Sequence, residues 1–426
     1  MKPVMSLRIS AVAIAMCVAV ALPGFARAAA GFTVLYSFCT LANCADGGAP
    51  NSLLADRHGN LFGTTVGGGT AQQGTVFAIS PAGTESVLYS FCPPSPTHCE
   101  TGEYPAPGLI EDSAGNFYGM TTDGGPCSGG ECSSAGTAFE LASDGTETTL
   151  YSFCTAPVHC TDGSDPGSGL TLDRHGNLFG VTEAGGATNR GALFRIAPGG
   201  TETVIHSFSC IIDTRRHADC PGGAFPSTRL VLDAANNLYG TTLVGGASYD
   251  AGGTVYKLAP DGSETVLYSF CSLANCADGA SPSAGLLMDR AGNFYGATAG
   301  GGAAAHAGKG RGGTVFRLAP DGTQTVLYAF CSRPRCADGN DPLGSMAFDE
   351  KGNLYGTTLY GGANNDGTIF MIAPDGTQTT LYSFCSQAGC ADGSAPSWLI
   401  SHWGYLYGTT FAGGASNNGI VFKLKE

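Results

Sequence analysis

The stretch Gly352–Cys385 reads GNLYGTTLYGGANNDGTIFMIAPDGTQTTLYSFC, and the rest of the chain consists of close variants of it. Its parts are a GN-aromatic-GTT segment, a Gly-Gly pair, a GTVF-like segment, a PDGT turn and a YSFC end. The YSFC-like, GN-aromatic-G and GTVF-like parts each occur seven times, at intervals of about 50–60 residues. Repetition at such a period indicates one architecture built from many copies, although 426 residues would ordinarily suggest two or three domains.

Each copy predicts four short strands, as the fifth copy illustrates. The strands are expected at Gly285–Asp289, Asn293–Thr298, Gly313–Leu318 and Gln324–Phe330. Apolar residues alternate along these segments, and the tight turns between them carry Gly after a polar residue, where a positive φ is needed. Four-stranded antiparallel units that recur in this way are typical of a β-propeller.

The two ends of the repeat region complement each other. Phe32–Phe38 reads as a fourth strand without its first three, and Gly419–Leu424 as a third strand without its fourth. The sequence therefore predicts an all-β, seven-bladed propeller in which the N-terminal strand completes the last blade. We expect one domain over 31–426, with blades near 52–91, 108–153, 169–208, 229–270, 285–330, 345–384, and 397–424 plus 32–38.

Residues 1–28 have the pattern of a secretory signal peptide. Lys2 and Arg8 precede the apolar run Ala11–Leu22, and Ala26–Ala28 offers a small-x-small cleavage site. Lipidation at Cys17 is disfavoured because Met16, rather than a small residue, precedes it. A run of twelve residues is shorter than the roughly 20 needed to span a bilayer. We expect a mature chain without a membrane span that is secreted, periplasmic or on the cell surface.

The sixteen cysteines other than Cys17 fall into eight close pairs. Paired spacing in an exported protein indicates disulfides, whereas zinc would need four ligands from different repeats and no paired histidines lie nearby. The expected disulfides are Cys39–Cys44, Cys92–Cys99, Cys127–Cys132, Cys154–Cys160, Cys210–Cys220, Cys271–Cys276, Cys331–Cys336 and Cys385–Cys390.

The formal charge of −14 becomes −17 when the three cations of the signal peptide are removed. Such a charge repels phosphate backbones, so nucleic acid is excluded as the expected partner. We expect a monomer that binds a carbohydrate or a protein.

The repeat at 292–323 and 352–377, with its GN-aromatic-GTT, Gly-Gly, GTVF and PDGT parts, resembles the Gloeobacter/Verrucomicrobia (GloVer) repeat family of exported bacterial proteins. This resemblance implies a propeller-like secreted or surface protein and supplies no catalytic residues. The L-x-x-D-x-x-G-N-L-Y phrase is also similar to other propellers, including calcium-dependent lactonases.

Binding residues are expected on the loops that differ between copies, because variable loops on a rigid frame carry most binding sites. The longest are the Gly-Gly loops Pro126–Ala135 and Ala303–Gly312 and the cysteine loop Ser209–Phe225. The candidate binding residues are Glu131, Arg215, Arg216, His217, His306, Lys309 and Arg311.

Two sets of aspartates recur. One set lies in the C-x-D-G-x-x-P phrase and offers weak calcium candidates, although Asp-Gly-x-x-Pro also suits a turn. This set is Asp46, Asp162, Asp278, Asp338 and Asp392. The other set begins a D-x-x-G turn in six copies and is expected to bond its own backbone. It comprises Asp56, Asp112, Asp173, Asp233, Asp289 and Asp349.

No H-x-x-x-H or G-x-S-x-G spacing occurs, so we predict no catalytic residues and no cofactor beyond the calcium candidates. The favoured hypothesis is a non-enzymatic exported propeller with a binding face. A metal-dependent hydrolase or lyase of the lactonase type, and a structural envelope or matrix component, are the alternatives.

Overall fold

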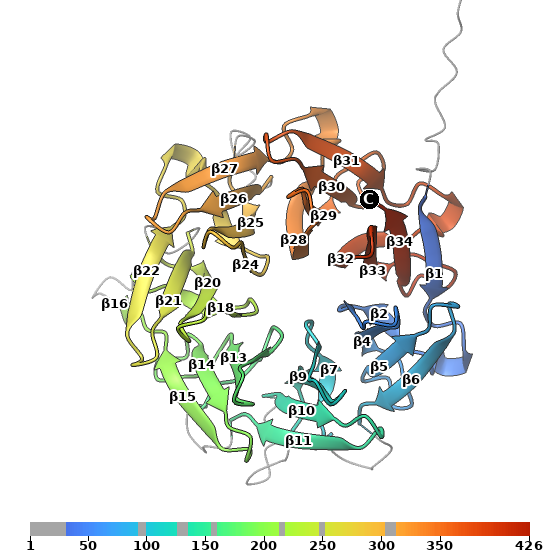
Figure 1. The fold of residues 1–426 in the computed structure, drawn as a ribbon, viewed down its shortest axis with the longest axis horizontal. Helices are drawn as coiled ribbons and strands as arrows, with labels where there is room; N and C mark the ends of the chain where they lie inside the picture. The colour runs from blue at the N-terminus through green and yellow to red at the C-terminus, as the bar shows by residue number, and fades with distance from the viewer. Residues whose placement is uncertain are drawn as a thin grey trace, which may run out of the picture.

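The computed structural model describes residues 31–92, 99–125, 135–154, 160–212, 218–246, 252–302 and 312–426. Seven antiparallel sheets stand around a central axis, which confirms the predicted seven-bladed propeller (Figure 1). Within these ranges, no helix is both long enough and apolar enough to cross a membrane.

Each blade is one sheet, and its strands run in sequence order from the axis outward, except that the N-terminal strand β1 (Thr33–Ser37) is the outermost strand of blade 7. Blade 1 contains β2 (Gly48–Pro50), β3 (Leu54–Ala55), β4 (Leu61–Gly67), β5 (Thr75–Ile79) and β6 (Glu85–Ser90). Blade 2 contains β7 (Glu103–Pro105), β8 (Ile110–Glu111), β9 (Phe117–Asp123), β10 (Thr137–Leu141) and β11 (Glu147–Ser152). Blade 3 contains β12 (Thr171–Leu172), β13 (Leu178–Thr182), β14 (Ala192–Ile196) and β15 (Glu202–Ser207).

Blade 4 contains β18 (Ala224–Pro226), β19 (Val231–Leu232), β20 (Leu238–Val244), β21 (Thr254–Leu258) and β22 (Glu264–Ser269). Blade 5 contains β23 (Ala280–Pro282), β24 (Leu287–Met288), β25 (Phe294–Gly300), β26 (Thr314–Leu318) and β27 (Gln324–Ala329). Blade 6 contains β28 (Asn340–Phe348), β29 (Leu354–Tyr360), β30 (Thr368–Ile372) and β31 (Gln378–Ser383). Blade 7 contains β32 (Ser394–His402), β33 (Tyr405–Ala412), β34 (Ile420–Lys425) and β1 (Thr33–Ser37).

Short elements lie in the connections between blades. A hairpin of β16 (Ile211–Ile212) and β17 (Ala218–Asp219) precedes blade 4. Single 3₁₀ turns occupy four cysteine loops, at η1 (Ala42–Cys44), η2 (Ala274–Cys276), η4 (Pro334–Cys336) and η5 (Ala388–Cys390).

The N-terminal strand closes the ring. β1 pairs antiparallel with β34, with Val34 opposite Phe422 and Tyr36 opposite Val421. Figure 1 shows the blue β1 beside the dark red β34, at the outer edge of blade 7. The predicted arrangement of three C-terminal strands and one N-terminal strand is therefore confirmed.

The innermost strand begins earlier than the sequence analysis expects. In blade 1 it starts at Gly48 instead of Ser52, so the end of the C-x-D-G-x-x-P phrase is strand and not turn. Proline is tolerated there because this strand is the edge nearest the axis. The proline also packs against the preceding blade: a Cβ added to Gly313 would lie 2.5 Å from Cδ of Pro342.

The glycine of the YGTT segment makes room for an aromatic ring on the next strand. Gly356 lies directly opposite Phe370, and a Cβ on Gly356 would be 2.5 Å from Cζ of that ring. The same pairing occurs in all seven blades: Gly63–Phe77, Gly119–Phe139, Gly180–Phe194, Gly240–Tyr256, Gly296–Phe316, Gly356–Phe370 and Gly408–Phe422.

Those rings also join neighbouring blades. Each contacts the phenylalanine that ends the fourth strand of the preceding blade, edge-on or tilted, with centroids 4.9–5.3 Å apart. Such aromatic pairs add specific geometry to a large buried area. The seven pairs are Phe38–Phe77, Phe91–Phe139, Phe153–Phe194, Phe208–Tyr256, Phe270–Phe316, Phe330–Phe370 and Phe384–Phe422.

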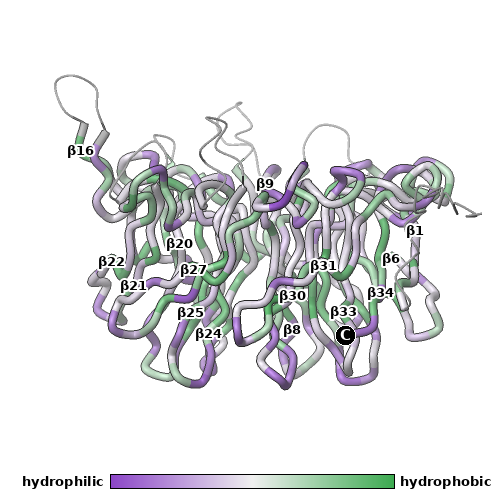
Figure 2. The backbone as a smooth tube through the Cα atoms, turned by 90° about the horizontal axis from the view of Figure 1, so that it is seen from above, coloured by the Kyte–Doolittle hydropathy of each residue, from purple (hydrophilic) through white to green (hydrophobic). Residues whose placement is uncertain are grey.

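The cysteine loops and the Gly-Gly loops share one end of the ring, here called the loop end; the other is the turn end. In every blade the carbonyl of the second cysteine accepts hydrogen bonds from both loops, as Cys44 does from Gly47 and Gly69. Seven disulfides are present, at the expected pairs other than Cys127–Cys132, which lies outside the described residues. Figure 2 shows β16 at the loop end, and the turns at the opposite edge.

Candidate functional site

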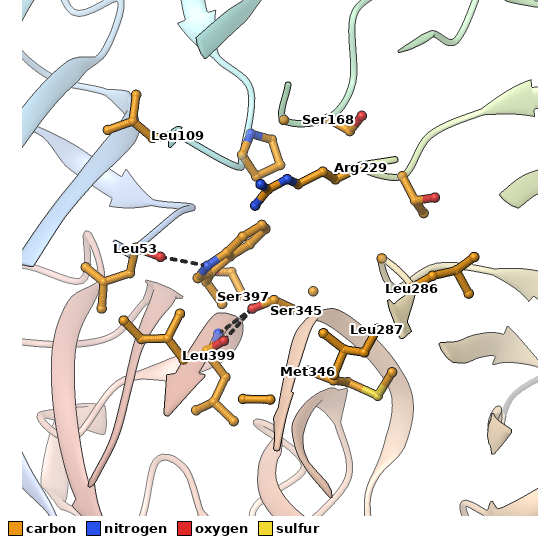
Figure 3. A pocket seen from close by; sticks show the side chains of 18 of the residues that line it. Leu53, Leu109, Ser168, Arg229, Leu286, Leu287, Ser345, Met346, Ser397 and Leu399 are labelled. Atoms are coloured by element: carbon orange, nitrogen blue, oxygen red, sulfur yellow. Dashed lines mark hydrogen bonds between the residues drawn. The ribbon is translucent and has the colours of Figure 1, made fainter. Parts of the chain in front are cut away.

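The seven innermost strands enclose a cavity of about 1090 Å³ on the propeller axis. It reaches from Leu243 and Phe411 near the loop end to Met288 and His402 near the turn end. Leucine and other apolar side chains form most of its wall, some of which Figure 3 shows. A cavity of this size and character matches the sites that hold drug-sized ligands.

Most polar side chains of this wall already have partners, because they join one blade to the next. Asn51 donates to the carbonyl of Pro105, Thr171 to that of Leu230, and Ser283 to that of Pro342. Ser345 donates to the carbonyl of Leu399, and Ser397 to that of Pro50. These hydroxyl and amide groups therefore hold the ring together and are not free for a ligand.

Trp398 gives the wall a rigid aromatic surface. Its indole Nε1 donates to the carbonyl of Leu53 in the next blade, at 3.0 Å. Its ring also reaches blade 2, where a Cβ on Gly108 would lie 3.7 Å from Cη2. The side chain is half-buried and lines the cavity, so one part of the ring remains accessible from inside.

Arg229 is the cation of this wall. Its side chain extends into the opening, across from Ser345, Ser397 and Leu399 (Figure 3). It is exposed to solvent inside the cavity, yet the surrounding blades enclose it, and this burial lowers the pKa of the guanidinium from its ordinary value. Among the described residues, no carboxylate or carbonyl accepts a hydrogen bond from it. An arginine has five donors and stays charged, so this group is available to an anion.

Glu183, the other charged residue in the described part of the wall, lies near the loop end, just after β13. Burial, and then the charge of Asp165, raise the pKa of its carboxyl.

Arg229 was missed by the sequence analysis, which favoured the long loops. A signal was present: the third residue after the proline is Arg229 in blade 4, but Gly108, Gly169 and Gly285 in blades 2, 3 and 5. Blades 1, 6 and 7 have Leu53, Ser345 and Leu399 there, so blade 4 carries the single charged residue at this position.

The seven binding residues predicted from the sequence all lie outside the described residues, so their placement stays a prediction. They are Glu131, Arg215, Arg216, His217, His306, Lys309 and Arg311.

The aspartates of the cysteine loops are buried and serve as acceptors within their own loops. Asp46 accepts from the Tyr36 hydroxyl, from the backbone and hydroxyl of Thr40, and from the Leu41 amide. Burial alone would raise the pKa of Asp46, but these hydrogen bonds outweigh it and lower the pKa. Asp278, Asp338 and Asp392 make the same four bonds, and Asp162 accepts from Tyr151. The bonds favour a loop-bracing role for these carboxylates over calcium ligation.

The aspartates that follow the innermost strands hold the turns, as expected. Asp349 accepts from the amides of Lys351 and Asn353 and from the Asn353 side chain. The equivalent bonds form at Asp56, Asp112, Asp173, Asp233 and Asp289.

A further set of titratable groups lies at the outer seams between blades. Burial, and then the charge of Asp46, raise the pKa of Glu85 to about 7; burial and then Asp162 raise that of Glu202 to about 7. Such shifts can mark a general acid. The other blades instead indicate a structural role for Glu85 and Glu202. Gln324 and Gln378 occupy the equivalent positions, and they donate hydrogen bonds to the carbonyls of Asp278 and Asp338.

This set makes stability depend on pH. A carboxyl with a folded pKa near 7 and an ordinary value of 4.5 favours folding fully below about pH 4.5, and this contribution is lost as pH rises through 7. We expect the double substitution Glu85→Gln and Glu202→Gln to stabilise the protein at pH 8, by about 1 kcal/mol per new hydrogen bond, and to change little at pH 5. Urea unfolding midpoints at both values measure this, with the exposed Glu350→Gln as control. An equal effect at both values would contradict the assignment.

Comparisons with known proteins agree with the architecture. The chain matches the Gloeobacter/Verrucomicrobia repeat over residues 25–219 and 211–422. None of the curated protein sequences is significantly similar to it. Virginiamycin B lyase from Staphylococcus aureus is 12% identical over 93% of this chain and 99% of the enzyme, with a TM-score of 0.55. A catalytically inactive variant of that lyase, solved with quinupristin, is 13% identical with the same coverage and TM-score.

A protein described as a gluconolactonase is 15% identical over 75% of this chain and 88% of its own, with a TM-score of 0.40. At identities this low the similarity to the two lyase structures shows the fold alone.

Proposed function

We propose that this chain, which belongs to the Gloeobacter/Verrucomicrobia repeat family, is an exported, non-enzymatic protein that binds a small ligand in its axial cavity. The observation that carries the proposal is the contrast between the repeated framework and the cavity wall. Glycine–aromatic pairs and cysteine loops recur in all seven blades, whereas the cavity wall has an arginine and a tryptophan at one position each, Arg229 and Trp398. Residues that occur in only one blade make the cavity wall asymmetric, and such residues can bind a ligand specifically.

Export is supported by the seven disulfides, which are typical of oxidising compartments, and by the pattern of residues 1–28. The loops predicted to bind a carbohydrate or a protein fall outside the described residues. The proposal therefore places the ligand inside the ring, and a partner on the loop face remains a separate expectation.

A metal-dependent hydrolase or lyase is the alternative, and the donor set of the described wall disfavours it. A catalytic metal in a propeller channel needs several carboxylate or histidine ligands that converge. In the described part of the wall, Glu183 and His402 are the side chains of this kind, and they lie near opposite ends of the cavity. One group of possible ligands elsewhere, Asp366 with Cys385 and Cys390, includes two cysteines already joined in a disulfide.

The test uses a neutral apolar fluorescent probe, N-phenyl-1-naphthylamine, and two matched variants. A side chain added at Gly285 would meet nothing within 4 Å and would enter the cavity, since Gly285 lines it; Gly199 is equally open but lies in an exposed turn. We expect saturable binding of one probe per chain, weakened at least tenfold by Gly285→Phe, because the new ring occupies the cavity. Fluorescence titration measures it.

Gly199→Phe is expected to leave probe affinity unchanged. Equal affinity in both variants would place the probe outside the cavity, and no saturable binding to the parent would refute the proposed function.

A further inference from the structure

The inference below rests on the proposed function and names the class of ligand. We propose that the cavity binds an amphipathic carboxylate, with the anionic group on Arg229 and the apolar body against the leucine-rich wall and the ring of Trp398.

The charge of the ligand follows from the polar groups of the wall. The side chains of Asn51, Thr171, Ser283, Ser345 and Ser397 are engaged by carbonyls of neighbouring blades. The guanidinium of Arg229 has no such partner among the described residues, and no described anion compensates its charge. An enclosed charge without a partner is costly unless a counter-ion or water satisfies it.

The apolar body follows from the rest of the wall. A free phosphate or sulfate would lose its water against leucine and methionine side chains and find one cation. A single carboxylate matches the fork of one guanidinium through two hydrogen bonds. An alkyl chain or aromatic ring attached to it would remove the apolar wall from water, which is the main source of affinity in such sites.

The net charge of the protein opposes the approach of an anion but does not prevent binding. The formal charge is −14, and most of the charged groups lie at the surface, where salt screens them beyond about 8 Å. Glu183 is the anion of the described wall, and it forms no ion pair with Arg229. The charge of the guanidinium is therefore left for a ligand to compensate.

The chain supplies its own reporter. It has two tryptophans, Trp398 in the cavity wall and Trp403, which is 65% exposed at the turn end. In a Trp403→Phe background, the fluorescence of Trp398 reports on the cavity alone. The probes are dodecanoate and dodecanol, which share an apolar chain and differ in the charged head group.

We expect dodecanoate to bind at least tenfold more tightly than dodecanol. Arg229→Gln should weaken dodecanoate at least tenfold and leave dodecanol within about threefold, because a charge-assisted hydrogen bond is lost and the apolar contacts remain. Arg290→Gln, an exposed cation at the turn that follows the innermost strand of blade 5, is the control and should change neither affinity. The melting temperature of the Arg229→Gln variant should not decrease, since the arginine makes no hydrogen bond to a described residue.

Four outcomes would count against the inference. Equal affinities for dodecanoate and dodecanol would show that the cavity does not recognise a carboxylate. An unchanged affinity of the Arg229→Gln variant for dodecanoate would show the same. In both cases the cavity would remain a binding site for N-phenyl-1-naphthylamine. Failure of both dodecyl probes to bind a protein that still binds N-phenyl-1-naphthylamine would mean that the ligand class is wrong. Failure of the protein to bind any of the three probes, dodecanoate, dodecanol and N-phenyl-1-naphthylamine, would refute the proposed function itself.

Discussion

A chain that lacks residues 31–38 is expected to lose its cooperative thermal transition, because these eight residues complete blade 7 and join it to blades 6 and 1. β1 is the outer strand of blade 7 and pairs with β34 along its length. Beyond the strand, Phe38 is fully buried against Phe77 of blade 1, and Phe32 stacks on Tyr382 of blade 6 at 3.9 Å. A fully buried aromatic such as Phe38 contributes about 3–5 kcal/mol, and the partly buried Phe32 and the pairing of β1 add to it, so the loss approaches the roughly 5–15 kcal/mol stability of a typical domain.

The deletion also exposes the edge of β34, which then offers unpaired backbone groups to other chains. We expect higher oligomers on size exclusion and a broad transition by circular dichroism, compared with a chain that starts at Gly31. Addition of the peptide Gly31–Phe38 in excess should restore part of the transition. A truncated protein that is monomeric and melts within about 2 °C of its parent, a shift worth about 2 kcal/mol or less for a chain of this length, would contradict closure of the ring by β1.

Phe370→Ala is expected to be the most destabilising of the single substitutions considered, at about 3–5 kcal/mol. The ring has no exposed surface, covers Gly356 on the neighbouring strand and contacts Phe330 of blade 5 at 4.9 Å. Its removal leaves a cavity between blades 5 and 6, and the hydrogen-bonded strands on either side cannot move to fill it. Urea unfolding measures the loss, with Tyr360→Ala, a 40% exposed position on the same sheet, expected to stay within about 0.5 kcal/mol.

The partner glycine gives a second readout. Gly356→Ala should cost about 1–3 kcal/mol by overpacking, since its Cβ would lie 2.5 Å from the ring, whereas Gly285→Ala meets nothing and should be neutral. In the double substitution with Phe370→Ala, the alanine at position 356 should cost almost nothing because the ring is gone. Additive effects would show that the two residues do not act as a pair.

The sequence predicts the ring well because repetition averages out local ambiguity. Seven copies of the same markers, with a lone fourth strand at Phe32–Phe38, leave little freedom for the closure. The innermost strand was misjudged at its start, because Gly and Pro at Gly48–Pro50 read locally as a turn. Only the edge position of that strand, and its contact with the preceding blade, make the proline compatible with a strand.

The candidate site was much less predictable. Arg229 lies in the short segment STRL, which has no periodicity of its own, and its position on the axis follows only from the assembled ring. Likewise, Asp46 looks like an exposed turn residue, but the loop folds over its carboxylate and supplies four hydrogen bonds. Long loops are conspicuous in a sequence because their length varies, whereas the cavity wall takes residues from every blade and forms only when the ring is assembled.

The pairing of β1 with β34 also has a consequence for biosynthesis. β1 belongs to the first described part of the chain to be made, and β34 to the last, with almost four hundred residues between them. Blades 1 to 6 can each assemble from contiguous chain, but the seventh sheet must wait until β34 has been made. Any product that ends before β34 therefore carries an unpartnered N-terminal strand, whose backbone groups can pair with another chain.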